Sequence, residues 1–211
     1  MAEKPILFSG PMVRAILAGR KTQTRRVVKS KEPLLDVIQK PKNGMWTGLT
    51  QLDPEPKGCL FTCRYGSPGD TLWVRETWLI DRYDGSTQYA ASHPCPSIPP
   101  RWKPSIHMPR NRCRLELEVT GVRIERLQSI KAKDIMAEGA VDRPHVDQFG
   151  RNPVSAFDGK VYLDLVSLWS AGWDSINGKT APWASNPWVW VVEFKPRRAD
   201  RRTVATNKEK S

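Results

Sequence analysis

Residues 114–120 read RLELEVT, an alternation of apolar and polar side chains. A period of two is typical of a strand with one face in the core and the other in solvent. Residues 71–78 read TLWVRETW and residues 187–194 read PWVWVVEF, and both are rich in the β-branched and aromatic residues that favour strands. Residues 4–8 predict a further strand, and residues 26–28 can begin another. Strands therefore dominate the expected fold.

Three short segments carry the signals of helices. Residues 9–19 read SGPMVRAILAG, with Pro where a first turn tolerates it and Gly where a helix ends. Residues 129–139 begin at Ser and end at Gly, with Ile130, Ile135 and Met136 as candidates for the inner face. Residues 160–169 predict the third helix. Because strands outweigh any regular strand–helix–strand repetition, the sequence predicts an α+β fold with a mixed sheet that closes or half closes into a small barrel.

Loop-rich segments interrupt this framework. Residues 31–60 and 81–105 are rich in Pro, and residues 142–159 also read as a loop. We expect a single domain over residues 1–196 that carries these three insertions, with Trp46 packing back onto the core. Residues 197–211 predict a basic, disordered tail.

Composition indicates the class of protein. A chain of 211 residues with 39% hydrophobic content and nine Trp can bury a core. No window reaches the apolar length of a membrane-spanning helix, and the N-terminus lacks the layout of a signal peptide. Four Cys do not form the dense framework of a secreted disulfide scaffold. We expect a cytoplasmic protein with reduced thiols and no membrane partner.

The net charge of +12 predicts a polyanionic partner, because Lys and Arg that neutralise phosphates release counterions. Residues 195–211 hold seven Lys or Arg and two acidic residues, so the larger share of the charge belongs to the body. Cys59 and Cys63 lack the two further ligands of a zinc site. No Gly-rich phosphate loop and no common hydrolase or metalloprotease motif is present. We expect neither a metal nor a cofactor.

The most specific motif covers residues 19–26, which read GRKTQTRR. It resembles the G-x-K-T-x-T-x-R signature of the ASCH domain family. Gly69 and Asp70 with the strand behind them resemble the family's G-D-x-L-x-V block, residues 127–139 its helix bearing a Glu, and residues 188–194 its final strand. The segments WVRETW and NPWVW are similar to those of long ASCH proteins in bacteriophages and prophages, for which the compartment is the host cytoplasm.

The resemblance implies a PUA-like β-barrel with short flanking helices and a cleft that binds RNA or a related ligand. One compact bacterial branch of the family is similar to N4-acetylcytidine amidohydrolases, in which a Lys, a Thr three residues later and a Glu on the following helix do the chemistry. By motif these roles fall on Lys21, Thr24 and Glu138. The present chain departs from that branch by its insertions.

Hydrolysis of an amide needs a nucleophile, a base and an acid for the leaving amine. Thr24 is the candidate nucleophile or water-orienting group, and Glu138 the proton carrier. Lys21 can be the base only if burial or neighbouring arginines lower its pKa below roughly 10.4. Since positions 21 and 24 face opposite sides of a regular strand, a joint role requires a turn after Gly19. Without the motif, the same residues are as readily a helix-end cation, a strand hydroxyl and a solvated carboxylate.

Further residues are candidates for ligand contacts. The planar guanidinium of Arg suits phosphate, and Trp offers a stacking surface. In the alternative interpretation Arg75 and Glu76 pair with each other while Trp73 and Trp78 lie in the core. A lone His is either a proton carrier or a structural residue. The candidate binding residues are Arg20, Arg25, Arg26, Arg75, Glu76, Trp78 and His107.

The sequence thus predicts an ASCH-type protein that binds a nucleoside or a nucleic acid, RNA or DNA, in a basic cleft and hydrolyses an N4-acylated cytidine-type amide. Two alternatives stay open. One is a PUA-like module that binds RNA or modified nucleic acid without turnover. The other is a ribonuclease, which a Lys, a Glu and several Arg around a phosphate can support.

Overall fold

The computed structural model describes residues 1–29, 34–42, 45–50, 57–93, 101–139, 154–155, 161–162 and 164–197. For residues 34–42, 50, 57–60, 154–155 and 161–162 it describes the backbone alone. The tail predicted over residues 197–211, apart from its first residue, and most of the insertion predicted at 142–159 lie outside this part of the chain.

Contacts divide the chain into two compact units. Unit 1 comprises Met1–Gly19, Tyr65–Thr120 and Phe194–Ser211, and unit 2 comprises Arg20–Arg64 and Gly121–Glu193. Each unit is therefore assembled from segments that are far apart in sequence. Two strands, β9 (Glu116–Arg126) and β12 (Trp188–Pro196), have residues in both units. The single domain expected over residues 1–196 stays a prediction.

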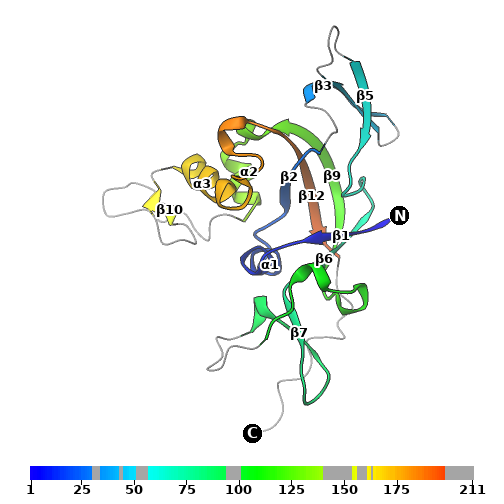
Figure 1. Ribbon diagram of the computed structural model, residues 1–211, viewed down its shortest axis with the longest axis vertical. Coiled ribbons are helices and arrows are strands. Elements are labelled where there is room, and N and C mark those ends of the chain that lie inside the picture. The colour runs from blue at the N-terminus through cyan, green and yellow to red at the C-terminus, as the bar shows by residue number, and fades with distance from the viewer. Residues whose placement is uncertain are drawn as a thin grey trace. The chain divides into compact units, whose positions relative to one another are not determined.

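Five strands form the main sheet in the order β1-β6-β9-β12-β2 (Figure 1). β1 (Glu3–Leu7) runs parallel to β6 (Thr71–Arg75), β6 is antiparallel to β9, and β12 is antiparallel to β2 (Gln23–Val27). The predicted α+β class with a mixed sheet is confirmed. Among the strands of the described residues, β1 and β2 are the edges and the sheet does not close into a barrel.

In unit 1, α1 (Gly10–Leu17) buries Val13 and Ile16, whereas Leu17, which the sequence also assigns to the apolar face, is 52% exposed. Leu72 and Val74 are completely buried on one face of β6. The insertion predicted at 81–105 is not all loop: β7 (Trp78–Ile80) pairs with β8 (Thr87–Tyr89), because a turn at Gly85 with φ of 70° reverses the chain. Short 3-10 helices follow at η1 (Ala90–Ser92), η2 (Ser105–His107) and η3 (Arg110–Arg112).

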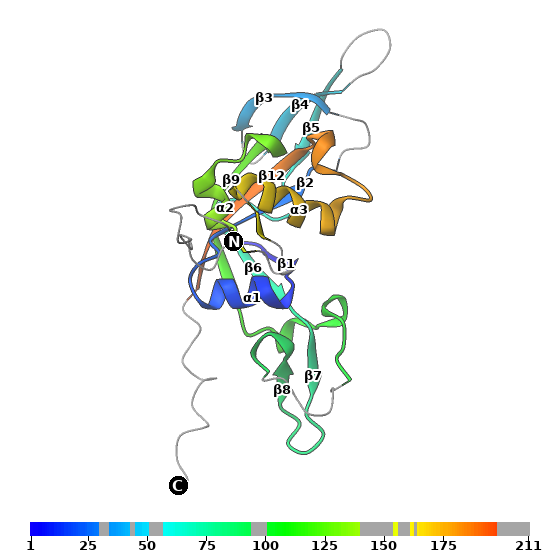
Figure 2. The same cartoon turned by 90° about the vertical axis from the view of Figure 1, so that its left-hand side faces the viewer.

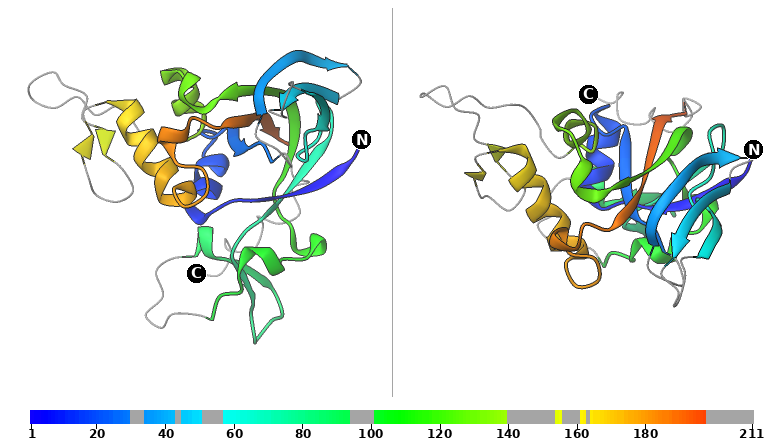
Figure 3. Two further views of the ribbon diagram at one scale, coloured as in Figure 1. Left: turned by 45° about the horizontal axis from the view of Figure 1, so that its top comes forward. Right: turned by 90° about the horizontal axis from the view of Figure 1, so that it is seen from above.

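In unit 2, the prediction of an irregular insertion at 31–60 is wrong. Strands β3 (Leu34–Lys42), β4 (Met45–Thr50) and β5 (Lys57–Thr62) form an antiparallel sheet (Figure 3). Pairing on both sides of β4 overrides the weak local pattern of this segment. Trp46 of β4 is buried and its ring meets Trp190 edge to face at 5.6 Å, so its predicted packing onto the core is confirmed.

Two helices complete unit 2 (Figure 2). Helix α3 (Leu165–Asn177) starts later and extends further than predicted, since Asp164 caps it by accepting from the backbone N–H of Ser167 at 2.8 Å. Its Trp173 packs against Val189 and Val191 of β12. Two short strands, β10 (Val154–Ser155) and β11 (Val161–Tyr162), pair ahead of α3, and η5 (Trp183–Ser185) follows it.

Helix α2 (Ala132–Ala137) is shorter than predicted. Ser129 belongs to η4 (Leu127–Ser129), and the first turn of α2 is instead capped by Asp134, which accepts from the backbone N–H of Lys131. Ile130 and Ile135 are buried as predicted, but Met136 is 52% exposed. No helix of the described residues has the length and apolar character needed to cross a bilayer.

The turn at Gly19 can be tested by substitution. Gly19 has φ of +71°, a conformation that an L side chain adopts at a cost of roughly 1–2 kcal/mol, and no described atom lies within 4 Å of an added Cβ. We expect Gly19→Ala to lower the unfolding free energy by about that amount. Gly172→Ala inside α3 meets nothing within 4 Å either, and should raise stability by about 0.4–1 kcal/mol. Urea denaturation measures both, and equal effects would contradict the strain at Gly19.

Candidate functional site

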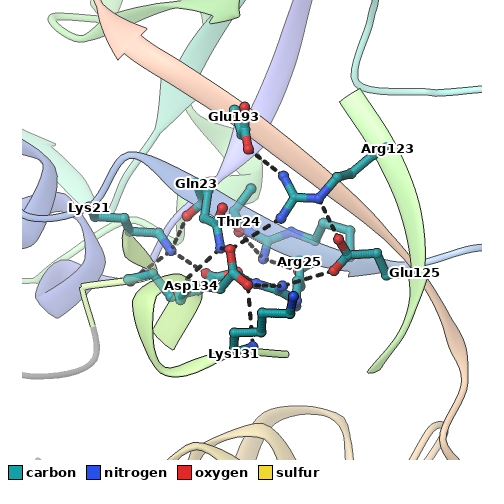
Figure 4. A network of polar contacts seen from close by, with 11 residues as sticks. Lys21, Gln23, Thr24, Arg25, Arg123, Glu125, Lys131, Asp134 and Glu193 are labelled. Carbon is teal, nitrogen blue, oxygen red and sulfur yellow. Dashed lines mark hydrogen bonds and ion pairs between the residues drawn. The ribbon is translucent and has the colours of Figure 1, made fainter. Parts of the chain in front are cut away.

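Strand β2 and helix α2 face each other through polar side chains (Figure 4). Lys21, Gln23 and Arg25 occupy alternate positions leading into and along β2, and such positions share one side of a strand. Asp134 and Glu138 are four residues apart, which places them on one side of a helix. The backbones also meet, since Lys21 and Glu138 form an isolated bridge. The repeat of the strand and the repeat of the helix therefore each place their polar side chains on one side, and these two sides face each other.

Lys21 is at the centre of this contact and is only 1% exposed. Its Nζ donates to Glu138 Oε2 at 2.7 Å, to the Glu138 carbonyl oxygen at 2.9 Å and to the Gln23 carbonyl oxygen at 2.8 Å. These three acceptors match the three donors of an ammonium group. Burial lowers the pKa of Lys21 below its ordinary value, although the charge and hydrogen bond of Glu138 act in the opposite direction.

Arg25 holds the other oxygen of Glu138. Its side chain is fully buried, and Nη1 lies 3.3 Å from Glu138 Oε1, while Nη2 lies 3.1 Å from Glu125 Oε2 and 3.7 Å from Asp134 Oδ2. Its Nε is buried and has no acceptor among the described residues. Because Glu138 binds one cation with each oxygen, the carboxylate has a fixed orientation.

A second layer of contacts holds Asp134. Gln23 Nε2 donates to its carbonyl oxygen at 3.1 Å, and Arg123 Nη2 lies 3.2 Å from Oδ1. Burial by itself would raise the pKa of Asp134, but the Lys131 N–H and the charge of Arg25 outweigh it, so the pKa is lowered. Arg123 also pairs with Glu125 and with Glu193 of β12. The network thus links β2, α2, β9 and β12 within unit 2.

Thr24 lies on the other side of β2. It is completely buried, and its Oγ1 accepts from Arg26 Nη1 at 2.9 Å. Arg26 is partly buried and also donates to the Arg25 carbonyl oxygen, and Arg20 is partly buried. Of the predicted trio, the structure brings together Lys21 and Glu138, and it places Thr24 on the opposite face of the strand, as strand parity requires.

The remaining candidates lie in unit 1. Glu76 is 1% exposed and accepts two hydrogen bonds of 2.8 Å from Arg114, so its predicted pairing with Arg75 is wrong. Arg75 instead donates from Nη2 to the carbonyl oxygen of Ile106. Trp78 is buried, which confirms its interpretation as a core residue, whereas Trp73 is only partly buried. His107 is exposed at the end of η2.

Several network residues escaped the sequence analysis. The spacing of these residues in the sequence could have indicated them. Asp134 precedes Glu138 by about one helical turn, and Arg123 and Glu125 are two residues apart, so they share one face of a strand. Within the described residues, no group of three or more His, Cys, Asp or Glu side chains is arranged to hold a metal ion. Cys113 is a free thiol.

Comparison of the chain with protein-family models, with curated proteins and with solved structures finds no match. The function of the chain is therefore inferred from the geometry and chemistry of the Lys21–Glu138 network.

The buried lysine predicts a pH dependence of stability. Between the lowered pKa of Lys21 and its ordinary value of 10.5, the unfolded chain binds more protons at this group than the folded chain does. The unfolding free energy should therefore rise with pH across this window. We expect the difference between wild type and Lys21→Met to grow in favour of wild type over the same range, as measured by urea denaturation. A constant or shrinking difference would show that burial does not disfavour the charged lysine. Lys133→Met, at an exposed position of α2, is the control for loss of a lysine.

Proposed function

We propose that this chain is an ASCH-type hydrolase that removes the acyl group from the N4 amine of an acylated cytidine-type base, with Lys21 and Glu138 at its centre. One observation carries the proposal: residues 117 positions apart in sequence form a buried ion pair of 2.7 Å. Isolated charges are costly to bury, and ionisable groups with perturbed pKa values are frequent at functional sites. A PUA-like architecture is part of the same proposal, supported by the motif at residues 19–26.

The chemistry requires a proton to move within this pair. Lys21 as a neutral amine takes a proton from the attacking water, and the water oxygen then bonds to the acyl carbon. Glu138 delivers a proton to N4 as the carbon–nitrogen bond breaks, so the products are a carboxylic acid and the free base amine. The lowered pKa of Lys21 supports the neutral form that this step needs. The contact with Glu138 Oε2 gives the proton a direct path between the two groups.

A second candidate is a binding module without turnover. It is favoured by the saturation of Lys21, whose three acceptors leave no ammonium donor for a ligand, and by the hydrogen bond that Arg26 makes to Thr24. In this case the Lys21–Glu138 pair orders the protein, and a nucleoside or nucleic acid binds elsewhere. The described residues offer no comparable observation in favour of the ribonuclease.

The two candidates are separated by incubation with N4-acetylcytidine, with loss of the acetyl group followed by chromatography. We expect conversion by wild type, and a loss of about 10²-fold or more in Lys21→Met and in Glu138→Gln, because each removes a proton-transfer group. Lys133→Met is the matched control and should retain wild-type rates. Thermal melts of all four proteins establish that the variants are folded.

Two results, obtained with folded proteins, would contradict the proposed hydrolase. If wild type at stoichiometric concentration leaves the acetyl group in place, this substrate is wrong and the binding module becomes the leading account. If Lys21→Met converts as fast as wild type, the reaction does not use this lysine.

The pH profile of hydrolysis gives an independent test of the base. Since only the neutral amine accepts a proton, kcat/KM should rise with pH along a limb whose midpoint lies below 10.5, the ordinary value for lysine. Steady-state rates in overlapping buffers measure this limb. A profile that is flat from neutral to alkaline pH would exclude Lys21 as the base.

A further inference from the structure

Unit 1 contains a strongly basic segment. Residues 101–115 include five Lys or Arg and no Asp or Glu. Two of its arginines are neutralised by carboxylates of unit 1: Arg110 pairs with Glu3 and Glu116, and Arg114 pairs with Glu76. These pairs are structural, because they tie the segment to β1, β9 and the end of β6. The remaining cations of the segment are Arg101, Lys103 and Arg112.

These three cations have no carboxylate partner among the described residues. Arg101 and Lys103 are exposed, and the Lys103 ammonium lies 4.9 Å from the centre of the Trp78 ring. Arg112 donates to the hydroxyl of Thr87 at 2.9 Å. Arg75 is a fourth such cation, since it binds the carbonyl oxygen of Ile106 and its Nε has no acceptor in the structure. The positive charges of these four residues are therefore not neutralised by an ion pair with any described carboxylate.

Hydrogen bonds attach this segment to the strands of unit 1. Lys103 exchanges backbone hydrogen bonds of 3.2 and 2.7 Å with Trp78 of β7. The Tyr89 hydroxyl on β8 donates to the Arg112 carbonyl oxygen at 2.9 Å. With the bond from Arg75 to Ile106, both ends of the segment are fixed to strands of the same unit. A segment whose backbone is fixed in this way loses less entropy on binding than a flexible loop does.

An aromatic side chain lies beside Arg75. Trp73 is partly buried, and the guanidinium groups of Arg75 and Arg110 lie 5.5 and 5.9 Å from the centre of its ring. Ile106 is 55% exposed beside the exposed His107. Proteins that bind single strands combine cations along the backbone with aromatic and arginine surfaces against which bases stack. A surface that bound only phosphate would need no such neighbours.

We propose that the basic surface of unit 1, formed by Arg75, Arg101, Lys103, His107 and Arg112, binds the phosphates of a single-stranded nucleic acid. This proposal rests on the proposed function in one respect: it extends the substrate class from the free nucleoside to a base within a polymer. Its binding should depend on salt, because each cation that contacts a phosphate releases condensed counterions.

The test uses the full chain and a labelled, unmodified single-stranded RNA oligonucleotide, with affinity measured by fluorescence anisotropy over a series of salt concentrations. In the double variant Arg101→Ala/Lys103→Ala, the plot of log affinity against log salt should become less steep by about 0.7 for each lost phosphate contact. The matched control removes two exposed lysines of unit 2, Lys133→Ala/Lys179→Ala, and should keep the wild-type slope. Arg101 and Lys103 are exposed, so the variant should fold, and a thermal melt checks this.

Three results would overturn the inference. One is an unchanged slope in the double variant together with folded protein. The second is equal affinity for inorganic polyphosphate or for phosphatidylserine vesicles at the same ionic strength, which would make the surface a general anion binder. The third is tighter binding to duplex RNA than to the single strand. Because the oligonucleotide carries no acyl group, a failure of N4-acetylcytidine hydrolysis leaves this test unaffected, and the two proposals can fail separately.

Discussion

The buried carboxylate of Glu138 is the constraint on which unit 2 depends. Lys21 binds one of its oxygens and Arg25 the other, and both cations come from the chain leading into and along β2. Loss of either cation leaves a buried charge short of a partner, which costs about 3–5 kcal/mol for pairs of this kind. The three residues therefore constrain one another, and they fix where α2 docks on the strand. Arg123 extends this constraint to β9 and β12 through Glu125, Asp134 and Glu193.

The same saturation that stabilises the network also restricts its chemistry. An ammonium group with three acceptors is well solvated by protein atoms, and it becomes a base only by giving its proton to a neighbour or to solvent. Glu138 is the neighbour in direct contact. A catalytic role thus needs a rearrangement of bonds that are already made, whereas a structural role needs none. The protonation state of Lys21, more than its position, therefore decides between the two candidate functions.

Local sequence patterns predicted the positions of the strands well, but they predicted poorly which residues contact one another. The alternation at residues 114–120 and the aromatic run at 187–194 correspond to β9 and β12, because period two reports which face is buried. The strands within residues 31–60 were not predicted, because they depend on pairing with one another and on the contact of Trp46 with Trp190. The ion pairs of Arg25 join residues 100 or more positions apart, which no local pattern encodes. The opposite placement of Lys21 and Thr24, by contrast, follows from strand parity alone.

Strand β12 also has a consequence for biosynthesis. It is the last strand of the described chain, yet it pairs with β2 near the start, and its residues belong to both units. Until the ribosome has made β12, β2 lacks its partner and the apolar side chains of Val27 and Leu127 lack the strand that covers them. Nascent chains with an unpaired strand edge and exposed apolar surface are prone to aggregate. The five-stranded sheet therefore stays incomplete until residues 188–196 have been synthesised, and up to that point the nascent chain exposes the apolar surface that β12 covers.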